Sequence, residues 1–353
     1  MSFDRPFVRT KERDGEKARQ ALIDAKLLDT ECKIAKDEDW LYFPLTQKKT
    51  EKGLKKILGK IKYEIGRREF TPVFMGPKTL SEALVGLLPS DLLELLPRAY
   101  DLIGDIAVIE IPDELTDYDR QIGAALKTVH KNFNTVLGKK GAISGTTRVR
   151  EYEVLAGQNK TKTIHTEYNL RIAVDVAKAY FSPRLLEEHN RIADLVRDDE
   201  LVIDMFTGVG PFALHIARRH RVKVYAVDIN PDAIDLLQES LELNRFAGEV
   251  IPILGDTHEY IQSGFDGDVD RVIMNHPSGA FEFVVDACKA LKPEGIMHYY
   301  EFMGGDNPEG SLTERITSLV EEAGRQVARI ETIRRVRDSA PHEYQMVADV
   351  VIQ

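Results

Sequence analysis

Two acids and two glycines stand where they could hold a nucleotide-like ligand. An apolar run leads to Asp204, and Gly208 and Gly210 follow shortly after it. Glycine permits positive φ angles and close approach of a ligand, and the helix expected after the loop would point its first N–H groups toward that ligand. The next expected strand ends in Asp228, an acid suited to paired ribose hydroxyls. The sequence therefore predicts a strand, a loop and a helix that bind a nucleotide-like molecule.

The spacing of this loop argues against a dinucleotide such as NAD. The dinucleotide fingerprint has three glycines, whereas Ala213 stands at the third position here and Pro211 lies inside the loop. With Asp204 and Phe206, the loop reads Asp-x-Phe-x-Gly-x-Gly and resembles motif I of class I S-adenosylmethionine (SAM) methyltransferases. No pyrophosphate binds there, so an acid is tolerated beside the methionine ammonium group. The alternative is the strand-turn-helix of any α/β protein.

Two more strand ends follow in the order that such a fold requires. Gly255-Asp256 ends an expected strand at 250–254 and could reach an adenine edge. Asn275-His276-Pro277 ends another at 271–274. A final hairpin that ends at 346–352 completes the alternation of strands and helices. This order predicts a parallel sheet closed by a terminal hairpin, which is the methyltransferase topology.

A cluster of charged residues precedes the loop. Pro183 predicts the start of a helix. Arg184, Glu188 and Arg191 would then share one helical face, with His189 beside them. The pattern fits a surface Arg–Glu pair as well as a group of functional residues.

The bulk composition is that of a globular protein. The chain has 353 residues, of which 43% are hydrophobic and 30% charged, enough for two or three domains. No apolar run reaches the roughly 20 residues of a membrane helix, and the N-terminus has no apolar signal segment. Cys32 and Cys288 lie far apart, without metal-ligand spacing. We therefore expect a cytoplasmic protein with no membrane association and no metal-binding residues.

Positive charge is concentrated in two stretches, although the formal net charge is -10. Lysine and arginine crowd residues 48–68, and a second basic stretch, 139–162, contains Arg148 and Arg150. These two arginines, at strand spacing, should project from one face. A solvated helix face alone would explain the first stretch. Together the two stretches favour contact with the phosphates of a polyanion.

Three domains are expected along the chain. Residues 1–70 have the pattern of a small α+β domain, and the aperiodic segment 63–72 is typical of a linker. Residues 71–175 predict a second α+β domain, with a strand pair near 100–112 and an amphipathic helix after it. Residues 176–353 contain the α/β pattern described above.

Taken together, the motifs identify the chain as similar to the archaeal and eukaryotic tRNA (guanine-37-N1)-methyltransferases. The resemblance covers essentially the whole chain and is most specific over 145–345. It implies a small N-terminal tRNA-binding domain, a middle α+β RNA-binding domain and a class I methyltransferase domain with a Rossmann-like, seven-stranded sheet, in a protein that works as a monomer. The segments that carry it are Arg148-Val-Arg-Glu151, Thr163-Ile-His165, Tyr180-Phe-Ser-Pro-Arg184, Asp204-Met-Phe206, Gly208-Val-Gly-Pro-Phe212, Asp228-Ile-Asn-Pro231, Met274-Asn-His-Pro277 and Ala340-Pro-His-Glu-Tyr344.

The resemblance also implies a role for each matching residue. Asp228 would bind the SAM ribose and Asp256 the adenine end. Asn275 would lie between the methyl donor and guanine, Arg148 would face guanine O6, and Glu188 would be the general base. The other implied cofactor contacts are His189, Asp204, Phe206, Gly208, Gly210, Ile229 and Thr257, and the other implied substrate contacts are Tyr180, Arg184 and Pro277.

Two departures from the family pattern concern the same region. The family often has arginine after the catalytic glutamate, where this chain has His189, and leucine where it has His276. His189 is therefore a rival for the role of base. SAM is the implied cofactor and tRNA the implied partner, and magnesium is an ion that could assist.

Two alternative functions stay open. One is a wybutosine-pathway enzyme that uses SAM on a modified guanosine at the same position; Asn275-His276-Pro277 favours plain methylation instead. The other is a non-catalytic RNA-binding protein with a vestigial SAM fold. The intact glycine loop and the acids Asp204, Asp228 and Asp256 argue against it, because a vestigial pocket needs none of them.

Overall fold

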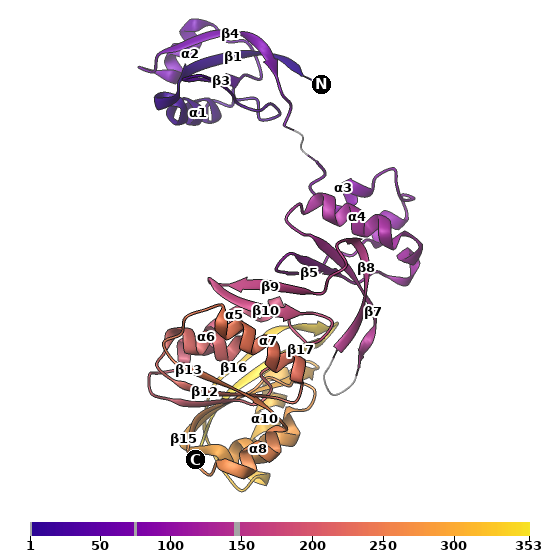
Figure 1. Ribbon diagram of the computed structural model, residues 1–353, viewed down its shortest axis with the longest axis vertical. Coiled ribbons are helices and arrows are strands. Elements are labelled where there is room, and N and C mark those ends of the chain that lie inside the picture. Colours follow the sequence, from indigo (N-terminus) through magenta and orange to yellow (C-terminus); the bar gives the residue numbers. More distant parts are fainter. Residues whose placement is uncertain (1, 74–75, 145–148) are drawn as a thin grey trace. The chain divides into compact units, whose positions relative to one another are not determined.

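A computed structural model of the protein describes residues 2–73, 76–144 and 149–353, with the side chains of 142–144 and 149 left aside. The chain divides into two compact units, Met1–Glu82 and Ala83–Gln353 (Figure 1). Arg148, which the resemblance places against guanine O6, lies outside the described residues.

The first unit is an antiparallel sheet with two helices. The strand order is β2-β3-β1-β4. Its helices bury one face each, and Leu22 and Leu54 pack with Val8 and Phe43 of the sheet. The elements are β1 (Phe3–Lys11), η1 (Glu12–Asp14), α1 (Gly15–Asp24), β2 (Ala35–Asp37), β3 (Trp40–Pro44), α2 (Glu51–Leu58) and β4 (Tyr63–Phe70).

The linker predicted at 63–72 is wrong for most of its length. Residues Tyr63–Phe70 form strand β4, which pairs antiparallel with β1 from Phe3↔Phe70 to Thr10↔Tyr63. Half of its residues are exposed and only Phe70 is buried, so the strand shows no clear apolar alternation. Because its partner lies near the N-terminus, no local pattern could reveal the pairing.

The second unit begins with short helices and a four-stranded sheet of order β5-β6-β7-β8. The strand pair expected near 100–112 is confirmed as β5 and β6, and helix α4, as expected, follows them and packs on β7 and β8. A separate hairpin, β9 and β10, packs on α7. The elements are α3 (Leu80–Leu84), η2 (Leu92–Leu95), β5 (Tyr100–Ile103), β6 (Ile106–Ile109), η3 (Asp113–Tyr118), α4 (Asp119–Val129), β7 (Thr135–Ser144), β8 (Val149–Gly157), β9 (Lys162–Glu167) and β10 (Leu170–Asp175).

A seven-stranded sheet of order β13-β12-β11-β14-β15-β17-β16 forms the rest of the unit. Its strands are parallel except for β17, which runs antiparallel to both neighbours, so the predicted parallel sheet with a terminal hairpin is confirmed. The elements are η4 (Pro183–Leu185), α5 (Leu186–Leu195), β11 (Leu201–Asp204), α6 (Pro211–Arg219), β12 (Lys223–Asp228), α7 (Pro231–Glu242), β13 (Glu249–Leu254), α8 (Thr257–Gly264), β14 (Val269–Met274), η5 (Ala280–Phe283), α9 (Val284–Ala290), β15 (Leu291–Gly304), α10 (Pro308–Glu322), β16 (Val327–Ala340) and β17 (Glu343–Ile352).

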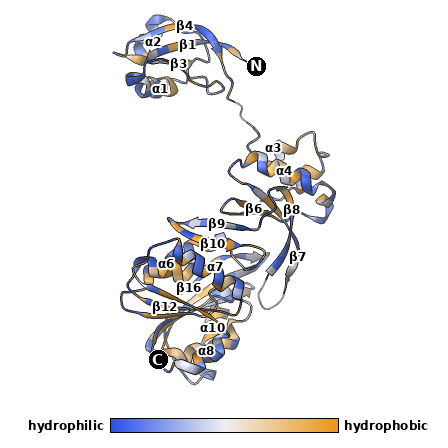
Figure 2. Cartoon of the chain, in the orientation of Figure 1, coloured by the Kyte–Doolittle hydropathy of each residue, from blue (hydrophilic) through white to orange (hydrophobic). Residues whose placement is uncertain are grey.

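Helices cover both faces of this sheet, because its strands are apolar on both sides. Val202 packs with the core on the side of α6, whereas its neighbour Ile203 packs with the core on the side of α9 and α10. Figure 2 shows hydrophobic residues gathered on the strands between the two helical layers. The carboxyl ends of β11, β12, β13 and β14 therefore meet at one edge, where ligands bind in open α/β sheets. Among the described residues, no helix is both long enough and apolar enough to cross a membrane.

Candidate cofactor and substrate site

The glycine loop lies between β11 and α6, as the sequence predicts. Gly208 and Gly210 have φ angles of 55° and 81°, in the left-handed region that favours glycine. A Cβ atom on Gly210 would also lie 2.3 Å from Leu237 Cδ1. The loop thus needs glycine at position 210 for both conformation and space, and Gly210 caps the N-terminus of α6.

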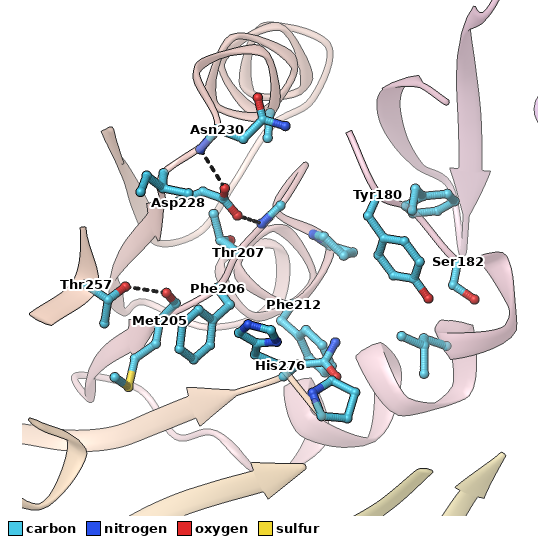
Figure 3. A pocket seen from close by; sticks show the side chains of 18 of the residues that line it. Tyr180, Ser182, Met205, Phe206, Thr207, Phe212, Asp228, Asn230, Thr257 and His276 are labelled. Atoms are coloured by element: carbon cyan, nitrogen blue, oxygen red, sulfur yellow. Dashed lines mark hydrogen bonds between the residues drawn. The ribbon is translucent and has the colours of Figure 1, made fainter. Parts of the chain in front are cut away.

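A cavity of about 300 Å³ opens beside this loop (Figure 3). It collects residues from the ends of β11, β12, β13 and β14 and from the segment before α5. The residues predicted from sequence that line it are Tyr180, His189, Phe206, Gly208, Asp228, Ile229, Asp256, Thr257, Asn275 and Pro277. The predicted residues Asp204, Gly210, Arg184 and Glu188 do not line it.

Asp228 is fixed by backbone donors at the end of β12. Its carboxylate accepts hydrogen bonds from the N–H groups of Gly208 at 2.7 Å and Asn230 at 2.9 Å. Burial raises the pKa of Asp228 above its ordinary value. The side chain therefore holds the loop while it lines the cavity, with the acceptor chemistry that two hydroxyl groups require.

Asp204 supports the loop from beneath. Its side chain is fully buried, and Oδ2 accepts a hydrogen bond from Thr207 Oγ1 at 2.8 Å. The other oxygen, Oδ1, has no hydrogen-bond partner, and burial raises the pKa of Asp204 to about 7. A buried polar atom without a hydrogen-bond partner is rare, so Oδ1 of Asp204 is distinctive among the acids around this loop.

The third acid, Asp256, caps a helix. Its side chain accepts hydrogen bonds from the N–H groups of His258 and Glu259 at the start of α8. The next residue, Thr257, donates its hydroxyl to the carbonyl of Met205 and so ties α8 to the glycine loop. Both residues lie on the cavity wall because β13 ends just before them.

Asn275 is oriented by residues that the sequence did not single out. Its Oδ1 accepts from Gln345 Nε2 at 2.9 Å, and Gln345 Oε1 accepts from Arg337 Nε at 2.7 Å. Arg337 also donates to Ser182 Oγ and Tyr180 Oη, both at 3.0 Å. Gln345 directly follows Ala340-Pro-His-Glu-Tyr344, one of the segments that carry the resemblance. This position is the feature of the sequence that could have identified it.

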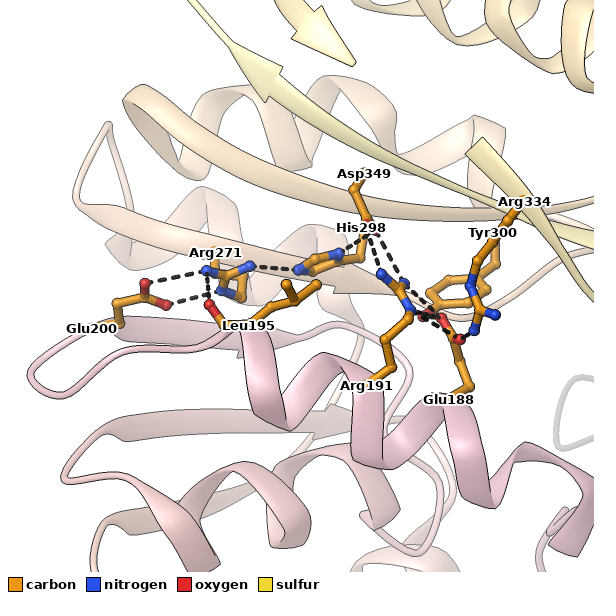
Figure 4. Close-up of polar contacts among 9 residues, drawn as sticks. All are labelled: Glu188, Arg191, Leu195, Glu200, Arg271, His298, Tyr300, Arg334 and Asp349. Atoms are coloured by element: carbon orange, nitrogen blue, oxygen red, sulfur yellow. Dashed lines mark hydrogen bonds and ion pairs between the residues drawn. The ribbon is translucent and has the colours of Figure 1, made fainter. Parts of the chain in front are cut away.

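Glu188 lies in a buried network rather than on the cavity wall (Figure 4). It is 1% exposed, and its carboxylate accepts from Arg191, from Arg334 and from Tyr300 Oη at 2.7 Å. Burial raises the pKa of Glu188, but the hydrogen bonds and charges of its partners outweigh this and lower it overall. Arg191 is the helical neighbour whose pairing with Glu188 the sequence left open.

His189, the next residue, does line the cavity. Its Nδ1 lies 2.9 Å from Glu167 Oε2, and the same oxygen lies 2.8 Å from His215 Nε2. Burial lowers the pKa of His189 despite the carboxylate beside it. Neither Glu167 nor His215 was singled out from the sequence, because they belong to different elements, β9 and α6.

A second cavity, of about 540 Å³, shares Tyr180, Phe181, Ser182 and Arg337 with the first. Its other charged residues are Arg98, Asp101, Glu110, Lys139, Arg150 and Arg184. The acids are paired: Arg184 Nε donates to Asp101 Oδ1 at 2.7 Å, and Arg150 Nη1 lies 3.5 Å from Glu110 Oε2. The excess of arginine and lysine makes this cavity suited to an anionic or hydrogen-bond-accepting ligand.

Comparison with known proteins identifies the family of this chain. The family described as the TRM5/TYW2 methyltransferase domain matches residues 163–333. The TYW2 N-terminal domain matches 80–161 and the tRNA methyltransferase 5 N-terminal domain 8–52. The tRNA (guanine(37)-N(1))-methyltransferase Trm5b of Pyrococcus abyssi is 38% identical over 97% of both chains. The Trm5b of Methanocaldococcus jannaschii is 34% identical over 98% of both.

Solved structures give the same relationship. The crystal structure of Trm5b from Pyrococcus abyssi has a TM-score of 0.73 at 36% identity and covers 99% of both chains. A complex of aTrm5 with tRNALeu has a TM-score of 0.75 at 33% identity, covering 98% of this chain and 99% of that one. The expected class I methyltransferase fold is thereby confirmed, and the chain belongs to the TRM5/TYW2 methyltransferase family.

Proposed function

We propose that this protein transfers the methyl group of SAM to N1 of guanosine 37 in tRNA. The observation that carries the proposal is the pair of neighbouring cavities with shared lining residues, in a chain that matches two guanine-37-N1 methyltransferases over nearly their full lengths. One cavity has the acids and glycines suited to a nucleoside, and the other has the cations suited to RNA.

The first cavity fits SAM. Asp228 offers its carboxylate to the ribose hydroxyls, and Asp256 with Thr257 bounds the adenine end. Phe206 and Ile229 supply apolar wall, and Gly208 allows close approach of the ligand to the backbone. Asp204 lies outside the cavity and supports its wall from beneath through the hydrogen bond from Thr207. When bound, SAM supplies an electrophilic methyl group on its sulfonium.

The second cavity is the proposed place of the target nucleotide. A guanine base must leave its stack to react, which costs a few kcal/mol that contacts elsewhere must offset. Tyr180 and Pro277 lie on the wall of the first cavity, and Arg184 on that of the second, where they can contact base and backbone. The cations Arg98, Lys139 and Arg150 stand where phosphates would pass.

Methylation of N1 requires that its proton leave as the new bond forms. Negative charge then spreads to O6, and a guanidinium there would stabilise the transition state more than the ground state. The resemblance gives that role to Arg148. Asn275, held in place by Gln345, would orient the base beside the methyl donor. The chain thus offers a positioning side chain and a stabilising charge.

Two side chains compete for the role of base. Glu188 is the residue that the resemblance implies, yet its carboxylate is engaged by Arg191, Arg334 and Tyr300. His189 lines the cavity. We keep Glu188 as the proposed base on the resemblance alone, which requires that tRNA binding free one of its carboxylate oxygens, and His189 as its rival.

A second candidate function has support of its own. The TYW2 N-terminal domain matches residues 80–161, and an aminocarboxypropyltransferase of Pyrococcus horikoshii acting on tRNA(Phe) is 30% identical. That relative spans 77% of this chain, whereas the two guanine-37-N1 methyltransferases span 97% and 98%. The fuller coverage of this chain, together with the match of the tRNA methyltransferase 5 N-terminal domain to residues 8–52, therefore favours methylation over aminocarboxypropyl transfer.

One experiment separates these functions. Unmodified tRNA and tRNA that carries 4-demethylwyosine at position 37 are each incubated with SAM and the full-length protein, and the nucleosides are analysed by mass spectrometry. Methylation adds the mass of one methylene, whereas the alternative adds an aminocarboxypropyl group. SAM binding measured by calorimetry distinguishes both from a non-catalytic RNA-binding protein, which would give neither product and no binding.

The protein is further proposed to act as a cytoplasmic monomer. The monomer is what the resemblance to the tRNA (guanine-37-N1)-methyltransferases implies. Light scattering of the free protein and of its tRNA complex tests the monomer, since a dimer would double the measured mass.

A further inference from the structure

Three side chains from separate elements converge beneath the cofactor cavity. Glu167 ends β9, His189 lies on α5 and His215 on α6. Glu167 Oε2, His189 Nδ1 and His215 Nε2 all lie within 4.8 Å of one another, and all three residues are buried. Their exposed fractions are 1%, 1% and 2%.

The ion-pair partners of Glu167 differ from those of Glu188, the other buried glutamate nearby. Glu188 is ion-paired with Arg191 and Arg334. For Glu167, in the part of the chain that the structure describes, every ion-pair partner is a histidine: His165, His189 and His215. Its second oxygen, Oε1, has no hydrogen-bond partner. None of these ion-pair partners carries a permanent positive charge, and a bound metal ion would supply one beside the carboxylate.

His165 is close to the cluster but is not a fourth ligand. Its Nδ1 accepts a hydrogen bond from the N–H of Gly104 at 3.1 Å, so the proton of the neutral ring is on Nε2. That Nε2 lies 3.7 Å from Glu167 Oε1 and faces it as a donor. At that distance it forms no hydrogen bond with Oε1, so it is an outer neighbour of the cluster.

We propose that Glu167, His189 and His215 bind a divalent cation of the zinc type. Two imidazoles and one carboxylate are a common three-residue zinc set, with a fourth position for water. Nitrogen ligands favour zinc, cobalt or iron over magnesium, which prefers oxygen. The ion would join β9, α5 and α6 under the cavity.

Metal binding would also settle what His189 offers to the cavity. An imidazole that ligates through Nδ1 keeps its proton on Nε2, so it is a hydrogen-bond donor. In the absence of metal, Nδ1 donates to Glu167 and Nε2 becomes an acceptor. With zinc bound, His189 therefore cannot act as a base. It can instead donate a hydrogen bond from Nε2 to a carboxylate or another acceptor group of a ligand.

The test is the metal content of tag-free protein. The chain is refolded with Zn²⁺ or with a chelator, dialysed, and analysed by plasma mass spectrometry, because the buried site is best loaded during folding. We expect one zinc per chain, a higher melting temperature than that of the chelated protein, and no such rise with Mg²⁺. Co²⁺ in place of zinc should give the visible absorption of a four-coordinate site.

Variants connect the ion to these residues. Glu167→Gln keeps the size and one acceptor, and His215→Ala removes one ligand; each should weaken zinc binding by more than about 100-fold, beyond the 10–100-fold effect of losing an outer neighbour. The matched control is His258→Ala, which removes an exposed histidine paired with Asp286 and should retain one zinc. Absence of zinc from the refolded wild-type protein overturns the proposal, and so does unchanged binding in both cluster variants. If a variant does not fold, the wild-type zinc and cobalt measurements still decide.

Discussion

At the scale of single residues, burial and partners decide what each acid can do. Asp228 and Asp204 lie around the same loop, but Asp228 lines the cavity and Asp204 is fully buried beneath it. Burial raises the pKa of both. Glu188 has a lowered pKa because its partners outweigh the effect of burial. Equivalent carboxylates therefore have different functions because of their neighbours.

Replacing Asp228 with Ala should weaken SAM binding, because the charge-assisted bonds to the ribose are lost. The expected loss is about 1.5–3 kcal/mol per bond, measured by calorimetry. The same change removes the acceptor for the Gly208 and Asn230 N–H groups. Asp228→Asn is the matched control, since it keeps an acceptor for the loop and should bind with intermediate affinity. Wild-type affinity in the Ala variant would refute the assignment of the ribose site.

Replacing Glu188 with Gln should lower the single-turnover rate by about 10²–10⁴-fold if Glu188 is the base, with little change in SAM and tRNA affinity. His189→Ala is measured beside it, with the pH profile of each enzyme. Because burial lowers the pKa of His189, a histidine base would lose its proton at lower pH than an ordinary histidine, and the rate would stop rising once it had done so. A Glu188-driven rate should keep rising as guanine N1 ionises. An active Glu188→Gln enzyme beside an inactive His189→Ala enzyme would transfer the role to His189.

At the scale of elements, the network around Arg191 fastens helix α5 to the sheet. Arg191 lies on α5, whereas Asp349 lies on β17 and His298 on β15. Asp349 Oδ1 is 2.6 Å from His298 Nδ1, and Arg191 donates to both Asp349 and Glu188. The helix that carries Glu188 and His189 thus depends on strands more than 100 residues later in the chain.

This network should make stability sensitive to acid. Burial raises the pKa of Asp349, but His298 and Arg191 more than compensate, so it lies well below its usual range. The folded state then binds fewer protons than the unfolded state, so the stabilisation is complete above the unfolded pKa of about 3.9 and is lost as pH falls toward the folded value. Asp349→Asn should be less stable at neutral pH by about 3–5 kcal/mol, since a buried ion pair is broken.

Chemical denaturation at neutral pH and at about pH 3 measures this difference. Wild-type protein should lose more stability between the two than Asp349→Asn, because the variant lacks the titrating carboxyl group. Equal losses in both proteins would contradict a stabilising role for the Asp349 charge.

Local sequence patterns predict local features, but they do not reveal contacts between residues or strands that are far apart in the chain. Gly208, Gly210 and Asp228 could be predicted because neighbouring residues in the sequence form the turn after β11 and the end of β12. Gln345, by contrast, reaches Asn275 only through the strand order of the sheet. The sequence of β4 predicts a linker because its partner strand, β1, lies at the other end of the first unit.

At the scale of the whole molecule, a lysine-rich surface belongs to the first unit and the two cavities to the second. Lysines 48, 49, 52, 55, 56, 60 and 62 are exposed, whereas Leu54 and Leu58 of α2 face the core. Within the described residues, none of these lysines forms an ion pair. Free cations on the surface of a self-contained unit are suited to RNA phosphates.

Deletion of residues 1–70 should therefore leave SAM binding intact and weaken tRNA binding. The logarithm of tRNA affinity should fall less steeply with salt, by about 0.9 in slope for each lost duplex contact. Lys52→Ala, Lys55→Ala and Lys56→Ala combined should reproduce part of the change, whereas Lys36→Ala, which removes a lysine paired with Glu12, should not. An unaltered slope after the deletion would mean that the lysines contact only water.

The central claim is that guanosine 37 is the methylated residue and N1 the methylated atom. The most direct measurement is mass spectrometry of nucleosides from two transcripts of one tRNA, with guanosine or adenosine at position 37, after single-turnover incubation with SAM and the full-length protein. We predict 1-methylguanosine from the first transcript, mapped to position 37, and no methylated product from the second. Methylation of both transcripts, or of guanosine at another position, would contradict the claim.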